Sequence, residues 1–321
     1  MLNNVQILIQ NGDKIYEPVV EEGVEWETER KGVPGKLTFN VIKDNVIDFQ
    51  EGNPVRLSVD GTNIFYGFVF TKKRDKNGII SVTAYDQLRY LKNKDTYVYQ
   101  NKSAADVIRL LAADFRLQVG VIEDTAYTIE KRIEDNKTLF DIIQTALDIT
   151  LQNKKKLYVL YDDFGKLTLK DVESMKLNLL IDADTAENFS YTSSINSNTY
   201  NKIKLSFENK DEGKRDIYIT QDSAKMNEWG VLQFYETIDE NCNGKAKADA
   251  LIQLYNKKTR NLTIDNAFGD LRVRAGTSVV IKLDLGDVSV QNYMLVEKAK
   301  HVFKNKEHMM NLTVRGGEFV G

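Results

Sequence analysis

Alternating apolar and polar residues dominate the first hundred residues of the chain and predict antiparallel β-structure. Residues 55–59 place valine and leucine on one side of a predicted strand and arginine and serine on the other. Residues 64–70 are apolar except for Gly67, a pattern typical of a strand covered on both faces. Gly67 indicates a bulge or bend that curls the sheet towards closure, so we predict a small barrel. The predicted hairpin turns are Asn11-Gly12, Asp60-Gly61 and Asn77-Gly78.

The hydrophobic period becomes that of a helix near residue 101. Ser103 followed by Asp106 predicts a capping box, ahead of an apolar stripe over residues 104–115. Thr138 followed by Asp141 opens a second predicted helix. A hairpin is then predicted, with strands at residues 157–161 and 167–169 around a turn at Asp163-Phe164-Gly165. This block predicts a compact α+β domain that extends to about residue 185.

Strand patterns return after residue 185, at residues 200–207 and 216–219. One helix interrupts them, and the cations Lys257, Lys258 and Arg260 near its C-terminal end suit the helix dipole without any ligand. The sequence therefore predicts a mainly β protein with an α+β insertion. The predicted parts are a first tube-like β-barrel domain at 1–100, a middle domain at 101–185, and a second β-barrel domain at 186–321 with an inserted helix near 245–258.

An internal repeat is the most informative feature of the pattern. Residues 52–57 (Gly-Asn-Pro-Val-Arg-Leu) resemble residues 276–281 (Gly-Thr-Ser-Val-Val-Ile). Each segment is followed by a turn, by a hydrophobic strand with a tyrosine (Tyr66 and Tyr293), and by a lysine-rich hairpin. Each then ends in a strand with an apolar residue before threonine, Val82-Thr83 and Leu312-Thr313. We predict two related barrels, although hairpins alone can produce similar spacing.

Charge and composition narrow the function. The chain has 321 residues, and its 44 basic and 47 acidic residues give a net charge of −3, which disfavours nucleic-acid binding as the main activity. One cysteine excludes an intramolecular disulfide framework and a cysteine-cluster metal site, and two histidines argue against a histidine-rich metal site. The N-terminus lacks a basic signal region, and no run of about 18 apolar residues occurs. We expect a soluble protein made in the cytoplasm, without membrane insertion.

Cys242 is the strongest catalytic candidate. It precedes the predicted helix near 245–258, whose N-terminal dipole would lower the pKa of a thiol, and His301 and His308 lie downstream. The alternative is that a lone cysteine lies in a polar loop and that both histidines flank a surface hairpin. No local signature of a cell-wall cysteine peptidase surrounds Cys242, and this alternative is favoured.

Other candidate sites also have simpler explanations. Asp162-Asp163 precedes a predicted hairpin turn, and Asp182, Asp184 and Glu187 lack the spacing of a calcium loop. The glycines at 32–35 and 316–317 match no phosphate-binding motif and are interpreted as turns. Lys154-Lys155-Lys156 is interpreted as a solvated connector between a helix and a strand. We predict no catalytic, cofactor-binding or metal-binding residue, no cofactor and no enzymatic activity.

The chain resembles the XkdQ/YqbQ family of baseplate hub proteins of contractile phage tails and phage-like particles of Gram-positive bacteria. The resemblance rests on residues 51–57, on residues 64–70, on residues 82–91 with their Tyr85-Asp86 step, and on the closing residues 312–317. The order of elements extends it over essentially the whole chain. It implies a relationship to the late control protein D group and to the hub half of type VI secretion spikes.

This resemblance implies a trimer of chains with two tube-like barrels each. Its six similar units would match a sixfold tail tube on one side and would seat a threefold spike on the other. The implied partners are further copies of the chain, the tail tube protein, a spike or tail-tip protein and other baseplate components. Assembly is expected in the host bacterial cytoplasm, followed by a place in the baseplate of a virion or a bacteriocin-like particle.

Two other functions remain as hypotheses. The first is a tail-associated cell-wall hydrolase that uses Cys242 with a histidine, which would lose its muralytic activity in a Cys242→Ala variant. The second is a carbohydrate-binding receptor module, because exposed tyrosines on strands suit stacking against sugars.

Overall fold

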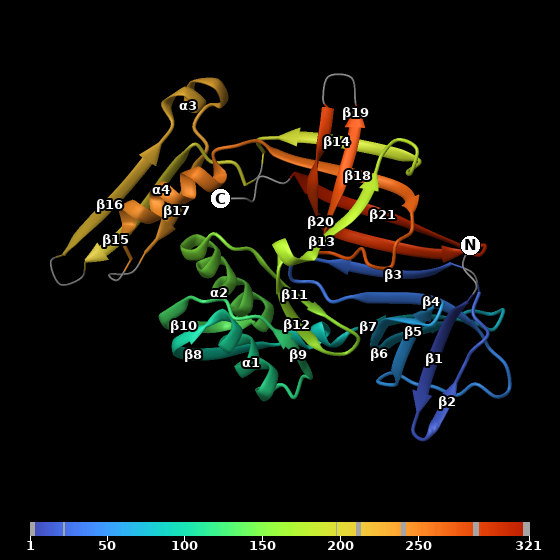
Figure 1. Cartoon of the computed structure of the whole chain (residues 1–321). Coiled ribbons are helices and arrows are strands. Elements are labelled where there is room, and N and C mark those ends of the chain that lie inside the picture. The colour runs from blue at the N-terminus through green and yellow to red at the C-terminus, as the bar shows by residue number, and fades with distance from the viewer. Residues whose placement is uncertain are drawn as a thin grey trace. The chain divides into compact units, whose positions relative to one another are not determined.

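The computed structural model describes residues 4–21, 23–196, 198–209, 213–238, 242–284 and 289–316. The chain forms two compact units (Figure 1). Unit 1 comprises Met1–Ser190 and Leu262–Gly321, and unit 2 comprises Tyr191–Asn261. In the described part of the chain, no helix is both long and apolar enough to cross a membrane.

A 13-stranded sheet dominates unit 1. Its first half contains β1 (Val5–Asn11), β2 (Lys14–Tyr16), β3 (Val24–Glu29), β4 (Lys36–Ile42), β5 (Pro54–Val59), β6 (Thr62–Arg74) and β7 (Ile79–Tyr85). Its second half contains β13 (Lys176–Ile181), β14 (Asn188–Ser194), β18 (Thr259–Phe268), β19 (Ser278–Asp284), β20 (Ser289–Lys304) and β21 (Glu307–Gly316). The chain passes into unit 2 through β14 and returns through β18.

The strand order confirms the predicted fold class, mainly β with an α+β insertion. The main path is β14-β18-β21-β20-β3-β4-β7-β6-β5-β1-β2, with β19 and β13 branching from β20. The pairings recorded for the described residues do not close either half into a barrel by itself. The domain limits at residues 100 and 185 stay a prediction, because these pairings and the two compact units do not define the ends of the barrels.

The strand β6 separates two environments. Phe65 and Val69 are buried in the core of the first half, whereas Tyr66 and Phe68 on the opposite face are half-buried. The bulge predicted at Gly67 is instead divided between two nearby places. The β5–β6 register shifts between Leu57 and Ser58, and the β6–β7 register shifts between Val69 and Thr71.

Gly67 itself pairs with Val55 and is needed for close approach. A Cβ atom there would lie 2.3 Å from the carbonyl oxygen of Tyr85 on β7 and 2.6 Å from the ring of Phe65. Any side chain at this position would therefore push two paired strands apart.

The predicted repeat is confirmed by the hydrogen bonds around its two glycines. Gly52 N–H donates to Val69 O (2.7 Å) and Val69 N–H donates to Asn53 O (2.9 Å). In the second copy, Gly276 N–H donates to Val296 O (2.8 Å) and Val296 N–H donates to Thr277 O (2.8 Å). Both glycines have positive φ, +88° and +97°, which favours glycine over residues with a side chain.

Strand registers extend this equivalence. Tyr66 pairs with Arg56 as Tyr293 pairs with Val280, so the two tyrosines occupy the same position in each copy. The register also shifts directly after Val69 and directly after its counterpart Val296. The equivalent strand orders are β3-β4-β7-β6-β5 and β14-β18-β21-β20-β19. We call the first set repeat 1 and the second set repeat 2.

Outside these five strands the copies differ. β1 pairs with β5 in antiparallel orientation, whereas β13 pairs with β19 in parallel orientation. The repeats are therefore related in their central strands but have different flanks.

The segment between the repeats contains two helices and two small sheets. Its elements are η1 (Gln87–Lys92), β8 (Lys94–Ser103), α1 (Ala104–Asp114), β9 (Val119–Ile122), β10 (Thr128–Thr138), α2 (Leu139–Lys154), β11 (Tyr158–Asp162), β12 (Leu167–Asp171) and η2 (Val172–Met175). β8 pairs with β10, and the second sheet has the order β11-β12-β9. The apolar faces of α1 and α2 share one core with Leu88 and Leu91 of η1. We call β8 to η2 the middle segment.

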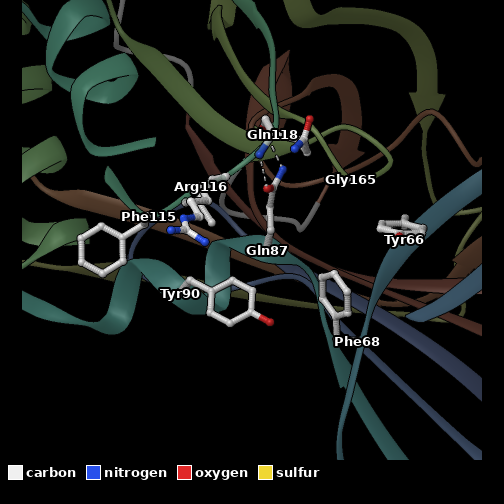
Figure 2. Close-up of a pocket in the computed structure, with 9 residues that line it drawn as sticks. Tyr66, Phe68, Gln87, Tyr90, Phe115, Arg116, Gln118 and Gly165 are labelled. Carbon is white, nitrogen blue, oxygen red and sulfur yellow. Dashed lines mark hydrogen bonds between the residues drawn. The ribbon is translucent and has the colours of Figure 1, made fainter. Parts of the chain in front are cut away.

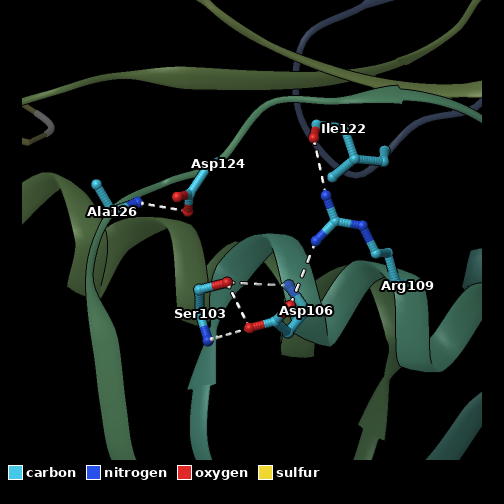
Figure 3. Close-up of polar contacts among 6 residues, drawn as sticks. All are labelled: Ser103, Asp106, Arg109, Ile122, Asp124 and Ala126. Carbon is cyan, nitrogen blue, oxygen red and sulfur yellow. Dashed lines mark hydrogen bonds and ion pairs between the residues drawn. The ribbon is translucent and has the colours of Figure 1, made fainter.

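The predicted helix starts in this segment are confirmed. Ser103 Oγ accepts from Asp106 N–H, and the Asp106 carboxylate accepts from Ser103 N–H, which forms a capping box (Figure 3). Arg109 extends this arrangement, because its guanidinium contacts Asp106 and donates to Ile122 O of β9 (3.0 Å). Thr138 caps α2 by accepting from Asp141 N–H.

Unit 2 has its own sheet and core. Its elements are β15 (Lys202–Asn209), β16 (Lys214–Gln221), α3 (Ser223–Trp229), β17 (Gln233–Thr237) and α4 (Gly244–Tyr255). β15 lies between β16 and β17, and α4 packs on β15 and β16. The predicted helix near 245–258 is present but ends at Tyr255, with Asn256 as its C-cap. The cations at 257, 258 and 260 therefore follow the helix.

A Gly67→Ala variant tests the close approach of β6 and β7. We expect a loss of about 1–3 kcal/mol in the free energy of unfolding, because the added methyl group overlaps the backbone of β7. Ser81→Ala, at an exposed position on β7, is the control and should change it by less than about 0.5 kcal/mol. Equal urea midpoints for both variants and the parent chain would contradict the packing described here.

Candidate assembly site: the strand junction between the repeats

The two repeats are joined by an antiparallel pairing of β3 from repeat 1 with β20 from repeat 2. The register runs from Glu29 opposite Lys298 to Val24 opposite Phe303, and Arg30 N–H adds a bond to Glu297 O (2.9 Å). β20 uses the same edge for two neighbours, because its first part pairs with β19 and its last part with β3. The junction therefore makes one continuous sheet from two copies.

Complementary charges line the junction. The Arg30 guanidinium makes two bonds to the Glu297 carboxylate, at 2.7 and 2.9 Å, and its side chain is only 5% exposed. Lys300 contacts Glu25 at 2.8 Å. A planar guanidinium facing a carboxylate in this way also fixes the alignment of the two strands. Glu25 on β3 thus contacts a cation on β20, and Glu297 on β20 contacts Arg30, which directly follows β3.

Two histidines lie beside these ion pairs, one buried and the other half-buried. His301 on β20 is fully buried and stacks on Trp26 of β3, with ring centroids 4.8 Å apart. Its Nε2 lies 2.9 Å from Val273 O, so Nε2 must carry the proton and donate. Its Nδ1, 2.8 Å from Nε2 of His308, therefore accepts from His308.

Burial sets the charge of both rings. Desolvation lowers the pKa of His301 to about 3, with a further contribution from His308. Desolvation likewise lowers the pKa of His308 to about 4. Both rings are neutral near pH 7, and His301 has no ring nitrogen left for proton transfer.

A buried polar cluster connects repeat 1, the middle segment and the turn before β19. Asp86 accepts from Gly35 N–H (2.9 Å) and Leu88 N–H (3.0 Å). Arg274 donates to Asp162 O (2.9 Å) and lies over the ring of Tyr161. Burial raises the pKa of Asp86 well above its usual value and that of Asp162 to about 6. The cluster therefore ties three separate stretches of unit 1 together.

Each repeat also has an unpaired strand edge. In β6, residues 62–68 pair with β5, but Thr71–Arg74 have no strand partner on the side away from β7 among the described residues. The equivalent residues of β20 are the ones that receive β3. β14, the equivalent of β3, pairs only with β18 in the described part of the sheet.

Cys242 and the two histidines belong to different units of the structure. Cys242 is half-buried in unit 2 and packs against its core with Ile203 and Ala248. His301 and His308 lie in unit 1, and His301 is buried, so the interpretation that both histidines flank a surface hairpin was wrong for the ring of His301. The pattern of alternation around His301 was the available signal for its inward orientation.

The acidic and basic candidates occupy turns and connectors. Asp182 accepts from Asp184 N–H and from the hydroxyl of Thr185, which is a turn role. Asp162 accepts from Gly165 N–H in the β11–β12 turn. Lys154–Lys156 are exposed between α2 and β11, as predicted. Residues 30–32 form a bend, and Gly35 leads directly into β4 with no helix after it. Gly316 is the last residue of β21, so its interpretation as a turn was wrong, and Gly317 lies outside the described residues.

Sequence reasoning missed the residues that form the junction. A signal was present, because residues 24–29 alternate apolar residues or threonine with glutamate and residues 298–301 place lysine at alternate positions. Opposite charges on alternating positions are typical of directly paired strands. Pairing across so long a sequence separation could not be deduced from local periodicity.

The fold is shared with solved tail proteins. It matches the 43 kDa tail protein of prophage MuSo2 from Shewanella oneidensis with a TM-score of 0.71 and 13% identity, over 98% of this chain and all of that one. It also matches E. coli c3393, described as a type VI secretion component similar to T4 tail proteins gp27 and gp5 (TM-score 0.58, 11% identity, 98% of this chain and 78% of that one). The chain therefore has a phage-tail-protein fold.

Sequence comparison identifies the family. The YqbQ-like family model matches residues 24–315. The chain is 30% identical to the uncharacterized protein YqbQ and 29% identical to the phage-like element PBSX protein XkdQ, both from Bacillus subtilis strain 168, over 92% of each chain. It belongs to the YqbQ-like family, as the resemblance predicted.

An Arg30→Met variant tests the junction. Because it leaves the Glu297 carboxylate without its main partner, we expect a loss of about 2–3 kcal/mol in the free energy of unfolding. The double variant Arg30→Met/Glu297→Leu should lose less than the sum of the single variants. Lys31→Met is the control. Lys31 is next in sequence, but its pair with Asp148, at 3.8 Å, is exposed, so its replacement should lower the free energy of unfolding by less than about 1 kcal/mol. Additive losses would show that the pair is not coupled.

The buried histidines predict loss of stability in acid. Their folded-state pKa values of about 3 and 4 lie below the usual 6.5, so the unfolded chain binds more protons as the pH falls. The two neutral histidines therefore make their full contribution to the free energy of unfolding above pH 6.5, and this contribution is lost as the pH falls from 6.5 to 3. Asp162, whose raised pKa is about 6, and Asp86, whose pKa is raised well above its usual value, act in the opposite sense, because protonation of a buried carboxylate stabilises the folded chain as the pH falls.

Urea titrations between pH 7 and 5 measure this dependence. Each histidine by itself removes up to about 1.4 kcal/mol per pH unit, and the protonation of Asp86 and Asp162 offsets part of that loss in the parent chain. His308→Phe should flatten the curve, and Asp162→Asn should steepen it by removing the opposing contribution. A His308→Phe curve parallel to that of the parent chain would refute the assignment.

Proposed function

We propose that the chain is a structural subunit of a tail baseplate hub, in which three copies form a pseudo-sixfold ring. The proposal rests on one observation: the edges of β14 and of the last part of β6, which have no strand partner among the described residues, correspond to the two strands that pair in the β3–β20 junction. β14 is equivalent to β3, and the last part of β6 is equivalent to the part of β20 that receives β3. Pairing β14 of one copy with β6 of the next repeats the junction between chains.

Side chains at these edges support this pairing. Residues 71–74 are Thr-Lys-Lys-Arg, and the equivalent residues 298–301 are Lys-Ala-Lys-His, so both edges carry cations. Phe189 and Tyr191 on β14 are half-buried at alternate positions, as Val24 and Trp26 are buried at alternate positions on β3. A head-to-tail contact of this kind closes into a ring when the rotation between copies fits. Closure would also protect edges otherwise open to aggregation.

The family resemblance supports three as the copy number. Three chains contribute six related repeats, which suits a sixfold tail tube, while the different flanks of the repeats keep a threefold face for a spike. The names of the matched relatives and structures, a phage-like element protein, a tail protein and a type VI secretion component, support placement in such a particle. We propose the tail tube, a spike or tail-tip protein and other baseplate components as partners, with assembly in the bacterial cytoplasm.

A structural role without catalysis belongs to this proposal. His301 cannot act as a base while both nitrogens are bonded, and Cys242 is packed beside the core of unit 2. The same proposal keeps the predicted division into two tube-like domains with the middle domain between them.

Disulfide cross-linking tests ring closure. In a Cys242→Ala chain, one cysteine replaces Thr71 or Lys73 on β6 and a second replaces Ser190 or Thr192 on β14. Oxidation should link three chains in at least one register, and size-exclusion light scattering should give three times the monomer mass. Pairing the β6 cysteine with Lys131→Cys, on an exposed position of β10, is the control and should give no such product. A stable monomer with no cross-link in any register would refute the ring.

A further inference from the structure

An aromatic groove of about 430 Å³ lies between repeat 1 and the middle segment. Tyr66 and Phe68 of β6 and Tyr90 of η1 form one part of its lining, and residues 115–118 after α1 form another (Figure 2). The rings of Phe68 and Tyr90 are 6.2 Å apart between centroids. We call this surface the β6 groove.

The repeat shows what covers the equivalent surface in the second copy. Phe68 pairs with Pro54 as Leu295 pairs with Ser278, so Phe68 and Leu295 occupy the same position. Leu295 is 4% exposed, because the middle segment covers it with an apolar cluster. The members of that cluster are Val159, Tyr161, Val172 and Met175.

The two equivalent glycines show the same difference. A Cβ atom on Gly276 would lie 2.7 Å from the side chain of Val159, whereas no atom of the described residues would lie within 4 Å of a Cβ atom on Gly52. Each chain has one middle segment. The apolar side chains of its β11–β12 hairpin cover repeat 2, while Phe164 and Gly165 in the turn of the same hairpin contact Tyr66 of repeat 1. The corresponding surface of repeat 1 is left with a groove.

The chemistry of the β6 groove is apolar and cationic. Among the described residues, none of those that line it is an aspartate or glutamate, although the chain as a whole has a net charge of −3. Arg116 lies exposed at its lining, and Arg56 and Arg89 stack near the rings of Tyr66 and Phe70. The polar lining residue Gln87 is already used, because its amide exchanges two hydrogen bonds with the backbone of Gln118.

We propose that the β6 groove docks an extended segment of a different tail subunit, one with apolar side chains and at least one carboxylate. The apolar side chains take the place that Val159 and Tyr161 have on repeat 2, and the carboxylate pairs with Arg116. The inference rests on the proposed ring. A ring of three chains would offer three open β6 grooves, one on each copy of repeat 1. These grooves would alternate with the three equivalent surfaces of repeat 2, which the middle segment of the same chain covers.

A peptide array tests the docking chemistry. Overlapping 15-residue peptides cover the other tail proteins encoded beside this chain and also the chain itself, and the purified full-length chain is the probe. We expect binding to peptides from another subunit that combine aromatic or aliphatic residues with Asp or Glu. In fluorescence anisotropy, Arg116→Glu should weaken the best peptide at least tenfold, while Lys131→Glu, an exposed cation on β10, should not.

The other outcomes overturn the proposal. Binding only to peptides of the chain itself would assign the groove to a second copy, and binding unaffected by Arg116→Glu, or no binding at all, would remove the site. Arg116 is exposed, so its replacement leaves the core intact. The β6–β14 cross-linking variant, with Arg116 unchanged, is tested for peptide binding as well, so a ring that forms without peptide binding refutes the groove alone.

Discussion

The antiparallel pairing of β3 with β20 is the contact on which the rest of unit 1 depends. It joins two sheets that would otherwise each end in open hydrogen-bonding groups, and it carries the Arg30–Glu297 pair and the buried His301. Backbone pairing supplies little selectivity by itself, because any edge can pair with any other. The charges and the stacked Trp26–His301 rings restrict this edge to one partner and one alignment.

A second consequence concerns the difference between the repeats. Their central strands agree down to individual hydrogen bonds at Gly52 and Gly276, yet β1 and β13 run in opposite senses relative to their neighbours. The middle segment covers Leu295 on repeat 2 but leaves a groove at Phe68 on repeat 1. The five equivalent strands thus give the two repeats similar edges. The flanking elements β1, β13 and the middle segment give the repeats different surfaces.

Local features of the fold could be predicted from the sequence, and long-range ones could not. The capping box at Ser103, the cap at Thr138 and the repeat from Gly52 to Leu312 all depend on short spacings or on self-similarity. The bulges beside Gly67 were misplaced, because a glycine that allows close approach and one that marks a bulge look alike in a sequence. The Arg30–Glu297 pair joins residues 267 positions apart, and the separate core of unit 2 has the same alternation as the large sheet. Local periodicity therefore predicts neither the Arg30–Glu297 pair nor the separate core of unit 2.

Unit 2 is inserted between two adjacent strands of the large sheet, β14 and β18, at a position that can accept a folded module. β3 and β4 are joined by the short bend of residues 30–35, and the equivalent strands β14 and β18 are joined by the whole of unit 2. Adjacent strands bring the entry and exit of an insertion close together, so a folded module can be grafted there at little entropic cost. An insertion at a hairpin lets such a protein carry an additional folded module while the pairing of its central strands is kept.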